Sequence, residues 1–189
     1  MKRIAIFASG SGSNAENIFN HFKENSTVEI SLILTNNANA YVIERAKNLE
    51  VKSHVFSKTD FLNTPSILTV LAENKIDLVV LAGFLLKIPE NLIKSYPNKI
   101  VNIHPALLPK YGGKGMYGDN VHKAVVAAKE TESGITIHFV NEHYDEGKVI
   151  FQAKFPVLEN DTYEDVAAKT HELEYEHFPK TIEFLLKKD

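Results

Sequence analysis

The chain has 189 residues, of which 44% are hydrophobic and 24% charged, and its formal net charge is −3. This size and composition are typical of one globular domain, and the slightly acidic balance excludes a broad basic surface for nucleic acid or anionic membranes. The absence of cysteine excludes disulfides, thiolate metal sites and cysteine nucleophiles. No apolar stretch reaches the ~20 residues of a bilayer span or has the pattern of a signal peptide, so we expect a cytoplasmic protein.

The first half of the chain alternates short apolar runs with amphipathic segments. The runs predict buried strands, and apolar residues at three- and four-residue spacing predict helices between them. We expect strands at residues 4–8, 28–34, 51–56, 76–81 and 100–104, and helices at 15–22, 42–49, 67–71 and 89–96. Strands separated in this way by helices are typical of a parallel sheet covered on both faces.

The second half changes its pattern. Residues 105–119 are rich in glycine and proline, and a loop of this length is usually functional. A helix is expected at 121–129, followed by two alternating runs, 135–140 and 149–155, which the connection at 141–147 can join as an antiparallel pair. A long final helix is expected from a cap at Asp161 to about Lys187, with Pro179 as a possible kink. The sequence predicts one α/β domain over residues 1–189, with a doubly wound, mostly parallel, Rossmann-like sheet, an antiparallel C-terminal edge pair and a long C-terminal helix.

A serine- and glycine-rich segment, residues 9–15, joins the first expected strand to the first expected helix. In a doubly wound sheet such a turn presents backbone N–H groups and a helix N-terminus to an anion. The segment also fits the dinucleotide pattern G-x-G-x-x-A, but residues 34–37 lack the acid that would hold a nicotinamide ribose. No Lys-Ser/Thr pair follows, which excludes a P-loop. We therefore predict a site for a single phosphate at Ser11, Gly12, Ser13 and Asn14; the alternative is a tight turn in which Ser13 or Asn14 caps the helix.

Asn102 and His104 end the fifth expected strand, and their spacing of two places both side chains on one face. Open α/β sheets carry their sites at the carboxyl ends of such strands. In acyl transfer an amide can donate to the oxygen that becomes negative, while an imidazole supplies or accepts a proton. From position alone, a buried histidine without chemistry is an equally good interpretation of His104. His138, in register with Thr136 in an expected strand, is interpreted as filling one face of the sheet.

Asp145 precedes the last expected strand, beside a glycine that lets the backbone turn sharply. A carboxylate at this place could hold His104 in one tautomer and raise the pKa of its imidazole toward neutrality. The alternative is an acidic surface turn, because the sequence does not establish that residues 104 and 145 meet. The eight histidines show no ligand spacing such as H-E-x-x-H, so no metal is expected.

Five stretches, taken in order, resemble the phosphoribosylglycinamide formyltransferase family, folate-dependent enzymes of purine synthesis and one-carbon metabolism. The run Asn-x-His-Pro-x-Leu-Leu-Pro is specific for folate-dependent formyl transfer, and the serine-glycine loop and the short chain narrow the resemblance to this family. The stretches span nearly the whole chain: residues 9–14, 81–84, 102–109, 134–140 and 145–147.

The resemblance implies that the primary amine of N1-(5-phosphoribosyl)glycinamide attacks the formyl carbon of 10-formyltetrahydrofolate, giving the N-formyl product and tetrahydrofolate. His104, tuned by Asp145, would stabilise the oxyanion and assist proton transfer, while Asn102 donates to the same oxygen. The partners implied are small molecules only, with no nucleic acid and no membrane, for a monomer or weak homodimer. The resemblance also implies that the Leu108–Pro109 bond is cis.

The same resemblance assigns binding residues. The substrate phosphate would bind to Ser11, Gly12, Ser13 and Asn14. The ribose would bind to His171 and Glu174, whose spacing allows them to share a helix face. The walls of the folate pocket match Leu85, Leu86, Lys87, Ile88, Asn102, Asn141, Glu142, His143, Tyr144 and Asp145.

The chain departs from the family pattern in two places. Residues 60–65 lack the arginine that relatives often place against the folate tail, and Lys58 or Lys87 could replace it. The glycine-rich loop at 111–118 is longer than in many relatives.

Other functions are compatible with parts of the sequence. The nearest alternative is a formyltransferase of the same superfamily that acts on an amino sugar nucleotide. A methionyl-tRNA enzyme would carry a further C-terminal domain and favour a basic surface, and a formyltetrahydrofolate hydrolase would usually add an N-terminal regulatory domain. A non-catalytic nucleotide-binding module would use the glycine loop but leave Asn102, His104 and Asp145 without a role.

Overall fold

The structure, a computed structural model, describes residues 1–187 and divides into two units, residues 1–101 and 102–189. The boundary falls inside strand β5 (Ile100–His104), so this strand contributes to both units. Hydrogen bonds connect the strands in the order β3-β2-β1-β4-β5-β6-β7. The predicted α/β class is confirmed, because the pairs among β1 to β4 are parallel and the last pair, β6 with β7, is antiparallel.

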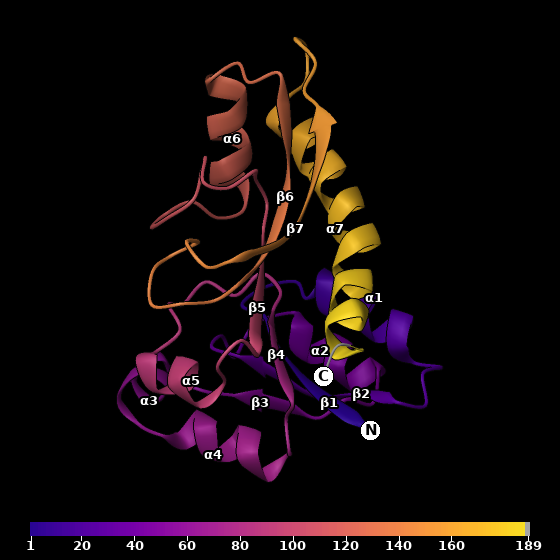
Figure 1. Ribbon diagram of the computed structural model, residues 1–189, viewed down its shortest axis with the longest axis vertical. Coiled ribbons are helices and arrows are strands. Elements are labelled where there is room, and N and C mark those ends of the chain that lie inside the picture. The colour runs from indigo at the N-terminus through magenta and orange to yellow at the C-terminus, as the bar shows by residue number, and fades with distance from the viewer. Residues whose placement is uncertain (188–189) are drawn as a thin grey trace. The chain divides into compact units, whose positions relative to one another are not determined.

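The N-terminal unit is built on parallel strands with helices between them (Figure 1). Its central strand, β1, is apolar and buried from Ile4 to Phe7, because it pairs with β2 on one side and β4 on the other. The elements in chain order are β1 (Lys2–Phe7), α1 (Ser13–Phe22), β2 (Val28–Thr35), α2 (Val42–Asn48), β3 (Ser53–Val55), α3 (Lys58–Asn63), α4 (Ser66–Glu73), β4 (Leu78–Leu81) and α5 (Glu90–Ser95).

Helix α4 covers the helix expected at residues 67–71, and a further short helix, α3, precedes it. Helix α3 begins after Ser57, whose side chain accepts a hydrogen bond of 3.0 Å from the backbone N–H of Asp60. This Ser-x-x-Asp spacing is a start signal visible in the sequence. The break between the helices follows from Pro65, which lacks a backbone N–H and disfavours helical geometry in the residue before it.

The C-terminal unit contains helix α6 (Asp119–Ala127), strands β6 (Glu132–Phe139) and β7 (Val149–Pro156), and helix α7 (Tyr163–Leu186). Helix α7 runs along β6 and β7 and also packs against α6 (Figure 1). The antiparallel pair is therefore as predicted, but the cap of the last helix is not. Thr162, rather than Asp161, caps α7 through reciprocal hydrogen bonds with Asp165, while Asp161 pairs with Lys169.

Two side chains of the sheet, Thr136 and Gln152, bind the loop after β5. Thr136 accepts a hydrogen bond from the backbone N–H of Leu108 (3.0 Å) and donates to the carbonyl of Ala106 (2.7 Å). Gln152 donates to the Leu108 carbonyl (3.1 Å) and to the Thr136 hydroxyl (2.9 Å). The Leu108–Pro109 bond is cis, as the family resemblance implies. These contacts hold the start of the long glycine-rich loop in one place.

Gly134 lies where two strand backbones approach too closely for a side chain. A Cβ at this position would overlap the carbonyl oxygen of Ala153 and would lie 2.9 Å from a methyl group of Leu107. We expect Gly134→Ala to lower the free energy of unfolding by about 1–3 kcal/mol, as in other overpacked sites. Urea denaturation would measure the change. Ser133→Ala is the matched control, because the Ser133 hydroxyl is buried without a hydrogen-bond partner; equal midpoints for the two variants would contradict the prediction.

No helix within residues 1–187 is both long enough and apolar enough to cross a membrane.

Candidate active site

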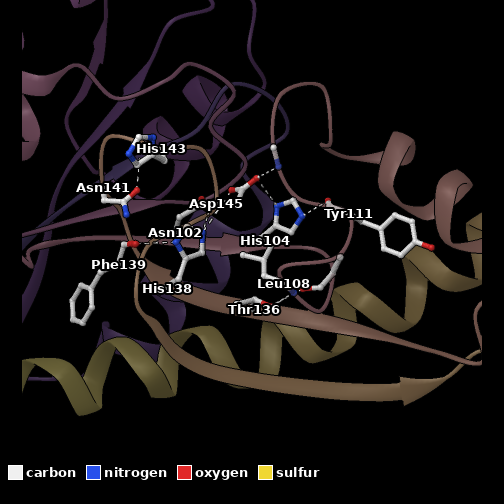
Figure 2. A network of polar contacts seen from close by, with 12 residues as sticks. Asn102, His104, Leu108, Tyr111, Thr136, His138, Phe139, Asn141, His143 and Asp145 are labelled. Atoms are coloured by element: carbon white, nitrogen blue, oxygen red, sulfur yellow. Dashed lines mark hydrogen bonds and ion pairs between the residues drawn. The ribbon is translucent and has the colours of Figure 1, made fainter.

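Four polar side chains meet in the C-terminal unit (Figure 2), and they come from β5, β6 and the loop between β6 and β7. His104 Nδ1 lies 3.6 Å from Asp145 Oδ2, and His138 Nε2 lies 3.7 Å from Asp145 Oδ1. Asn102 Nδ2 lies 3.1 Å from His138 Nε2. Residues 104 and 145 therefore do meet, and the alternative of an acidic surface turn is wrong, because only 13% of the Asp145 side chain is exposed.

The backbone conformation of Asp145 directs its carboxylate toward His104 and His138. Asp145 adopts the left-handed conformation, with φ 56°, which aspartate and asparagine tolerate better than most residues. Oδ2 accepts a hydrogen bond of 2.9 Å from the backbone N–H of Gly113. Burial raises the pKa of the Asp145 carboxyl, but contact with the His138 ring, the positive charge available on His104 and the Gly113 N–H together lower this pKa below its ordinary value. The group is therefore an anion at neutral pH.

The His104 ring is buried and touches a backbone carbonyl. Its Nε2 lies 2.8 Å from the carbonyl oxygen of Tyr111, a residue that also adopts the left-handed conformation (φ 56°). A carbonyl oxygen only accepts, so Nε2 carries a hydrogen. In the neutral ring, Nδ1 is then unprotonated, and it faces the Asp145 carboxylate. Nδ1 is therefore the basic nitrogen of the site.

The pKa of His104 moves in the direction opposite to the one expected. Burial is the largest influence and lowers the pKa, while Asp145 and the Tyr111 carbonyl raise it and His138 lowers it again. The net pKa lies below the ordinary value of 6.5. The expected rise toward neutrality is thus wrong, because the carboxylate at 3.6 Å does not compensate for the lost hydration of an imidazolium ion.

His138 does more than fill a face of the sheet, as had been expected for it. Its Nε2 contacts the Asn102 amide and its Nδ1 lies 2.9 Å from the carbonyl oxygen of Phe139. A signal for this role was present in the sequence. An antiparallel hairpin between residues 135–140 and 149–155 must return its connection toward the end of the first strand, which brings Asp145 near His138.

A second group of ionisable side chains lies on the two helices of this unit. His171 Nδ1 and Glu174 Oε2 on α7 are 3.0 Å apart, so the predicted ribose residues do share a helix face. The carboxylate raises the pKa of His171. His122 on α6, which no pattern in the sequence indicates, is buried, and the charges of His171, Glu174 and His104 all influence its pKa. The expected folate-wall residues Glu142, His143 and Tyr144 are exposed, and His143 N–H donates to Asn141 at 2.9 Å.

In the N-terminal unit, the serine-glycine loop is a tight strand-to-helix turn without a side-chain cap. Gly12, with φ 74°, occupies the cap position of α1, so the alternative in which Ser13 or Asn14 caps the helix is wrong. A Cβ on Gly12 would overlap Val42, which explains the glycine. Arg45 holds the loop from outside: its Nε donates to the Ser11 carbonyl at 2.8 Å and its guanidinium pairs with Glu16.

The same loop is bonded to the segment that carries the first expected folate residues. The Ser9 hydroxyl donates to the side chain of Asn36 (2.7 Å) and accepts from the backbone N–H of Leu85 (3.0 Å). Within residues 85–88, Leu85 is half exposed and Ile88 is buried. Among residues 1–187, no three His, Cys, Asp or Glu side chains are placed to share a metal ion.

The buried histidines predict a loss of stability in acid. Burial is the main cause that lowers the pKa of His104 and His122 below 6.5. Between that value and the lowered ones, the unfolded chain binds more protons than the folded chain, so the free energy of unfolding falls as pH drops through this range. His171, with its raised pKa, acts in the opposite direction. Urea midpoints at about pH 7 and about pH 5.5 should show the loss, and His122→Gln should reduce it; a midpoint that rises on acidification would contradict it.

Comparisons with known proteins identify the family of the chain. The formyl transferase family matches residues 2–182. A phosphoribosylglycinamide formyltransferase of Bacillus subtilis is 36% identical over 98% of this chain and 95% of its own length. A chloroplastic enzyme of the same name from Vigna unguiculata is 39% identical over 97% of this chain, which spans 61% of that longer protein. The crystal structure of glycinamide ribonucleotide transformylase 1 from Geobacillus kaustophilus superimposes with a TM-score of 0.90 at 36% identity, covering 98% of this chain and 99% of that one.

A family match over nearly the whole chain and relatives above 30% identity, together with an amide, two imidazoles and a buried carboxylate in contact, lead to one conclusion: the chain belongs to the formyl transferase family, among relatives that are phosphoribosylglycinamide formyltransferases.

Proposed function

We propose that this protein transfers a formyl group from 10-formyltetrahydrofolate to the primary amine of N1-(5-phosphoribosyl)glycinamide, in purine synthesis. The products are the N-formyl compound and tetrahydrofolate. The observation that carries the proposal is the contact of His104 and His138 with the Asp145 carboxylate, beside the Asn102 amide. Acyl transfer to an amine needs these groups, namely an N–H donor for a developing negative oxygen and a base with a stabilising anion.

The donor set fits an N-formyl group. The folate supplies a formyl carbon whose oxygen gains negative charge when the amine attacks. One N–H of Asn102 Nδ2 faces His138, and we assign the second N–H to that oxygen. A preorganised donor of this kind typically contributes about 3–4 kcal/mol to lowering a barrier.

His104 handles the proton that the attacking amine must lose. The lowered pKa keeps the ring neutral at pH 7, so Nδ1 is available as a base. A proton taken up at Nδ1 arrives 3.6 Å from the Asp145 carboxylate, which stabilises the resulting imidazolium ion. The carbonyl oxygen of Tyr111 accepts the hydrogen bond from Nε2 of the same ring before and after this proton transfer. Asp145 stays ionised and holds the charge of the base in place.

The binding residues follow from the same proposal. Ser11, Gly12, Ser13 and Asn14 bind the acceptor phosphate with the N-terminus of α1, where Gly12 leaves the first N–H groups without a side-chain cap. His171 and Glu174 bind the ribose. The folate-binding residues we propose are 85–88 in the N-terminal unit, and Asn102 and 141–145 in the C-terminal unit. The chain acts as one formyltransferase domain on small molecules in the cytoplasm, as a monomer or weak homodimer.

An assay with two acceptors tests the proposal. Purified full-length protein is incubated with 10-formyltetrahydrofolate and either N1-(5-phosphoribosyl)glycinamide or an amino sugar nucleotide, and both the formylated product and tetrahydrofolate are quantified. We expect product in equal amount to tetrahydrofolate with the glycinamide acceptor only. Formylation of the amino sugar nucleotide alone would favour the other formyltransferase of the superfamily, and tetrahydrofolate released without any acceptor would indicate a hydrolase.

A further inference from the structure

We propose that His138 is a positioning residue, which sets the orientation of the Asn102 amide and so decides that a donor, rather than an acceptor, faces the reacting oxygen. The inference rests on the proposed function and adds a residue to it. The residues concerned, Asn102, His138, Phe139 and Asp145, all lie in the C-terminal unit and are drawn together in Figure 2.

A backbone carbonyl contacts one ring nitrogen of His138. His138 Nδ1 lies 2.9 Å from the carbonyl oxygen of Phe139, the next residue in the chain. A carbonyl can only accept, so Nδ1 must carry the hydrogen of this contact. A neutral imidazole has one ring hydrogen, and Nε2 is then left with a lone pair. The backbone therefore selects the tautomer of His138.

The lone pair on Nε2 decides the orientation of Asn102. The Asn102 amide lies within hydrogen-bond distance of Nε2, at 3.1 Å, and Asp145 Oδ1 is farther from it, at 3.7 Å. An accepting nitrogen requires an N–H, so the amide presents Nδ2 to His138 and not Oδ1. With the amide turned over, two lone pairs would face each other inside the protein.

Neither water nor Asp145 takes the place of the Asn102 amide at His138 Nε2. The His138 side chain is 3% exposed, so solvent does not compete for Nε2. Asp145 Oδ1 is 3.7 Å away, beyond the distance of an N–H···O hydrogen bond, and a carboxylate cannot donate to a lone pair. His138 is thus the residue that distinguishes the two amide orientations of Asn102.

The orientation matters for formyl transfer because the two ends of an amide have opposite effects on a developing oxyanion. An N–H stabilises the negative oxygen, whereas a carbonyl oxygen in its place repels it. An asparagine without a fixed partner can adopt both orientations. His138 removes this ambiguity without touching the substrate.

A double-mutant cycle tests the proposal by activity. We expect His138→Ala to lower kcat by about 10- to 100-fold with little change in either KM, and Asn102→Ala to lower it by about 10²- to 10³-fold. In the Asn102→Ala background, His138→Ala should cost no more than about 2-fold, because its effect passes through the amide. His138→Gln should recover most of kcat, since its side-chain oxygen can accept near the position of Nε2. Fully additive losses would overturn the proposal and indicate an effect through Asp145.

A spectroscopic readout keeps this inference separate from the proposed function. In ¹⁵N-labelled full-length protein at neutral pH, the imidazole nitrogens of His138 should show a protonated Nδ1 and an unprotonated Nε2. The Asn102→Ala variant should change the Nε2 resonance. A protonated Nε2 would overturn the proposal, because that nitrogen would face the Asn102 oxygen. If the protein shows the expected tautomer but transfers no formyl group, the proposed function fails and the orientation of Asn102 stands. Urea midpoints of each variant exclude unfolding as the cause of lost activity.

Discussion

Replacement of His104 by alanine is expected to lower kcat by about 10²- to 10⁴-fold, the usual contribution of a positioned acid-base group. The loss arises because no other side chain offers an unprotonated nitrogen beside Asp145 in this arrangement, Nε2 of His138 being occupied by Asn102. The KM values should change much less, since the buried ring makes its contacts with protein groups. Steady-state kinetics with both substrates would measure the two effects.

The matched control is His21→Ala, which removes an exposed imidazole in the last turn of α1. It should retain wild-type turnover. Because His104 is buried, its replacement also leaves a cavity, so the urea midpoint of the variant must show that it is folded under assay conditions. A folded His104→Ala variant with turnover near that of the wild type would remove His104 from the chemistry.

Asp145→Asn is expected to lower kcat by about 10²-fold or more while leaving the fold intact. Asparagine has nearly the same shape, tolerates φ 56° and can still accept from the Gly113 N–H. It lacks the negative charge that raises the pKa of His104. The plateau of kcat should therefore fall, and the acidic limb of its pH profile should move to lower pH, because a weaker base stays unprotonated in more acidic solution.

Two comparisons make this prediction specific. Glu146→Gln removes a charge from the exposed neighbouring residue and should change neither the plateau nor the limb. A plateau that falls without any movement of the acidic limb would separate Asp145 from His104 and assign it another role, such as holding the Gly113 backbone.

The fold could be predicted where the pattern is local. Uninterrupted apolar runs identified the buried parallel strands, and the alternating runs near the C-terminus identified the antiparallel pair of β6 and β7. The details that failed depended on side-chain hydrogen bonds at the starts of two helices. Helix α3 was missed although Ser57 and Asp60 have the spacing of a cap, and the cap of α7 was placed at Asp161 rather than Thr162.

The candidate site could be predicted in its residue types but not in its electrostatics. Strand ends and a glycine turn made Asn102, His104 and Asp145 candidates, and the family resemblance supplied their roles. The structure brings the histidine and the carboxylate to 3.6 Å. The direction of the His104 pKa could not be predicted, because it depends on how much water the surrounding side chains exclude. The contact between His104 and Tyr111 could not be predicted either, because a backbone oxygen of Tyr111 makes it.

That backbone contact separates the chemistry of His104 from the amino acid at position 111. The acceptor is a main-chain oxygen, so alanine scanning would remove the phenol of Tyr111 and its hydrogen bond to Glu130 without removing the group that chooses the basic nitrogen. Residues at ease with a positive φ, such as glycine or asparagine, would preserve that choice, whereas a β-branched residue would resist the conformation and move the oxygen. The path of the backbone, and not the side chain at position 111, would then preserve the base. Relatives could carry any residue that tolerates a positive φ at this position and still retain the same proton acceptor.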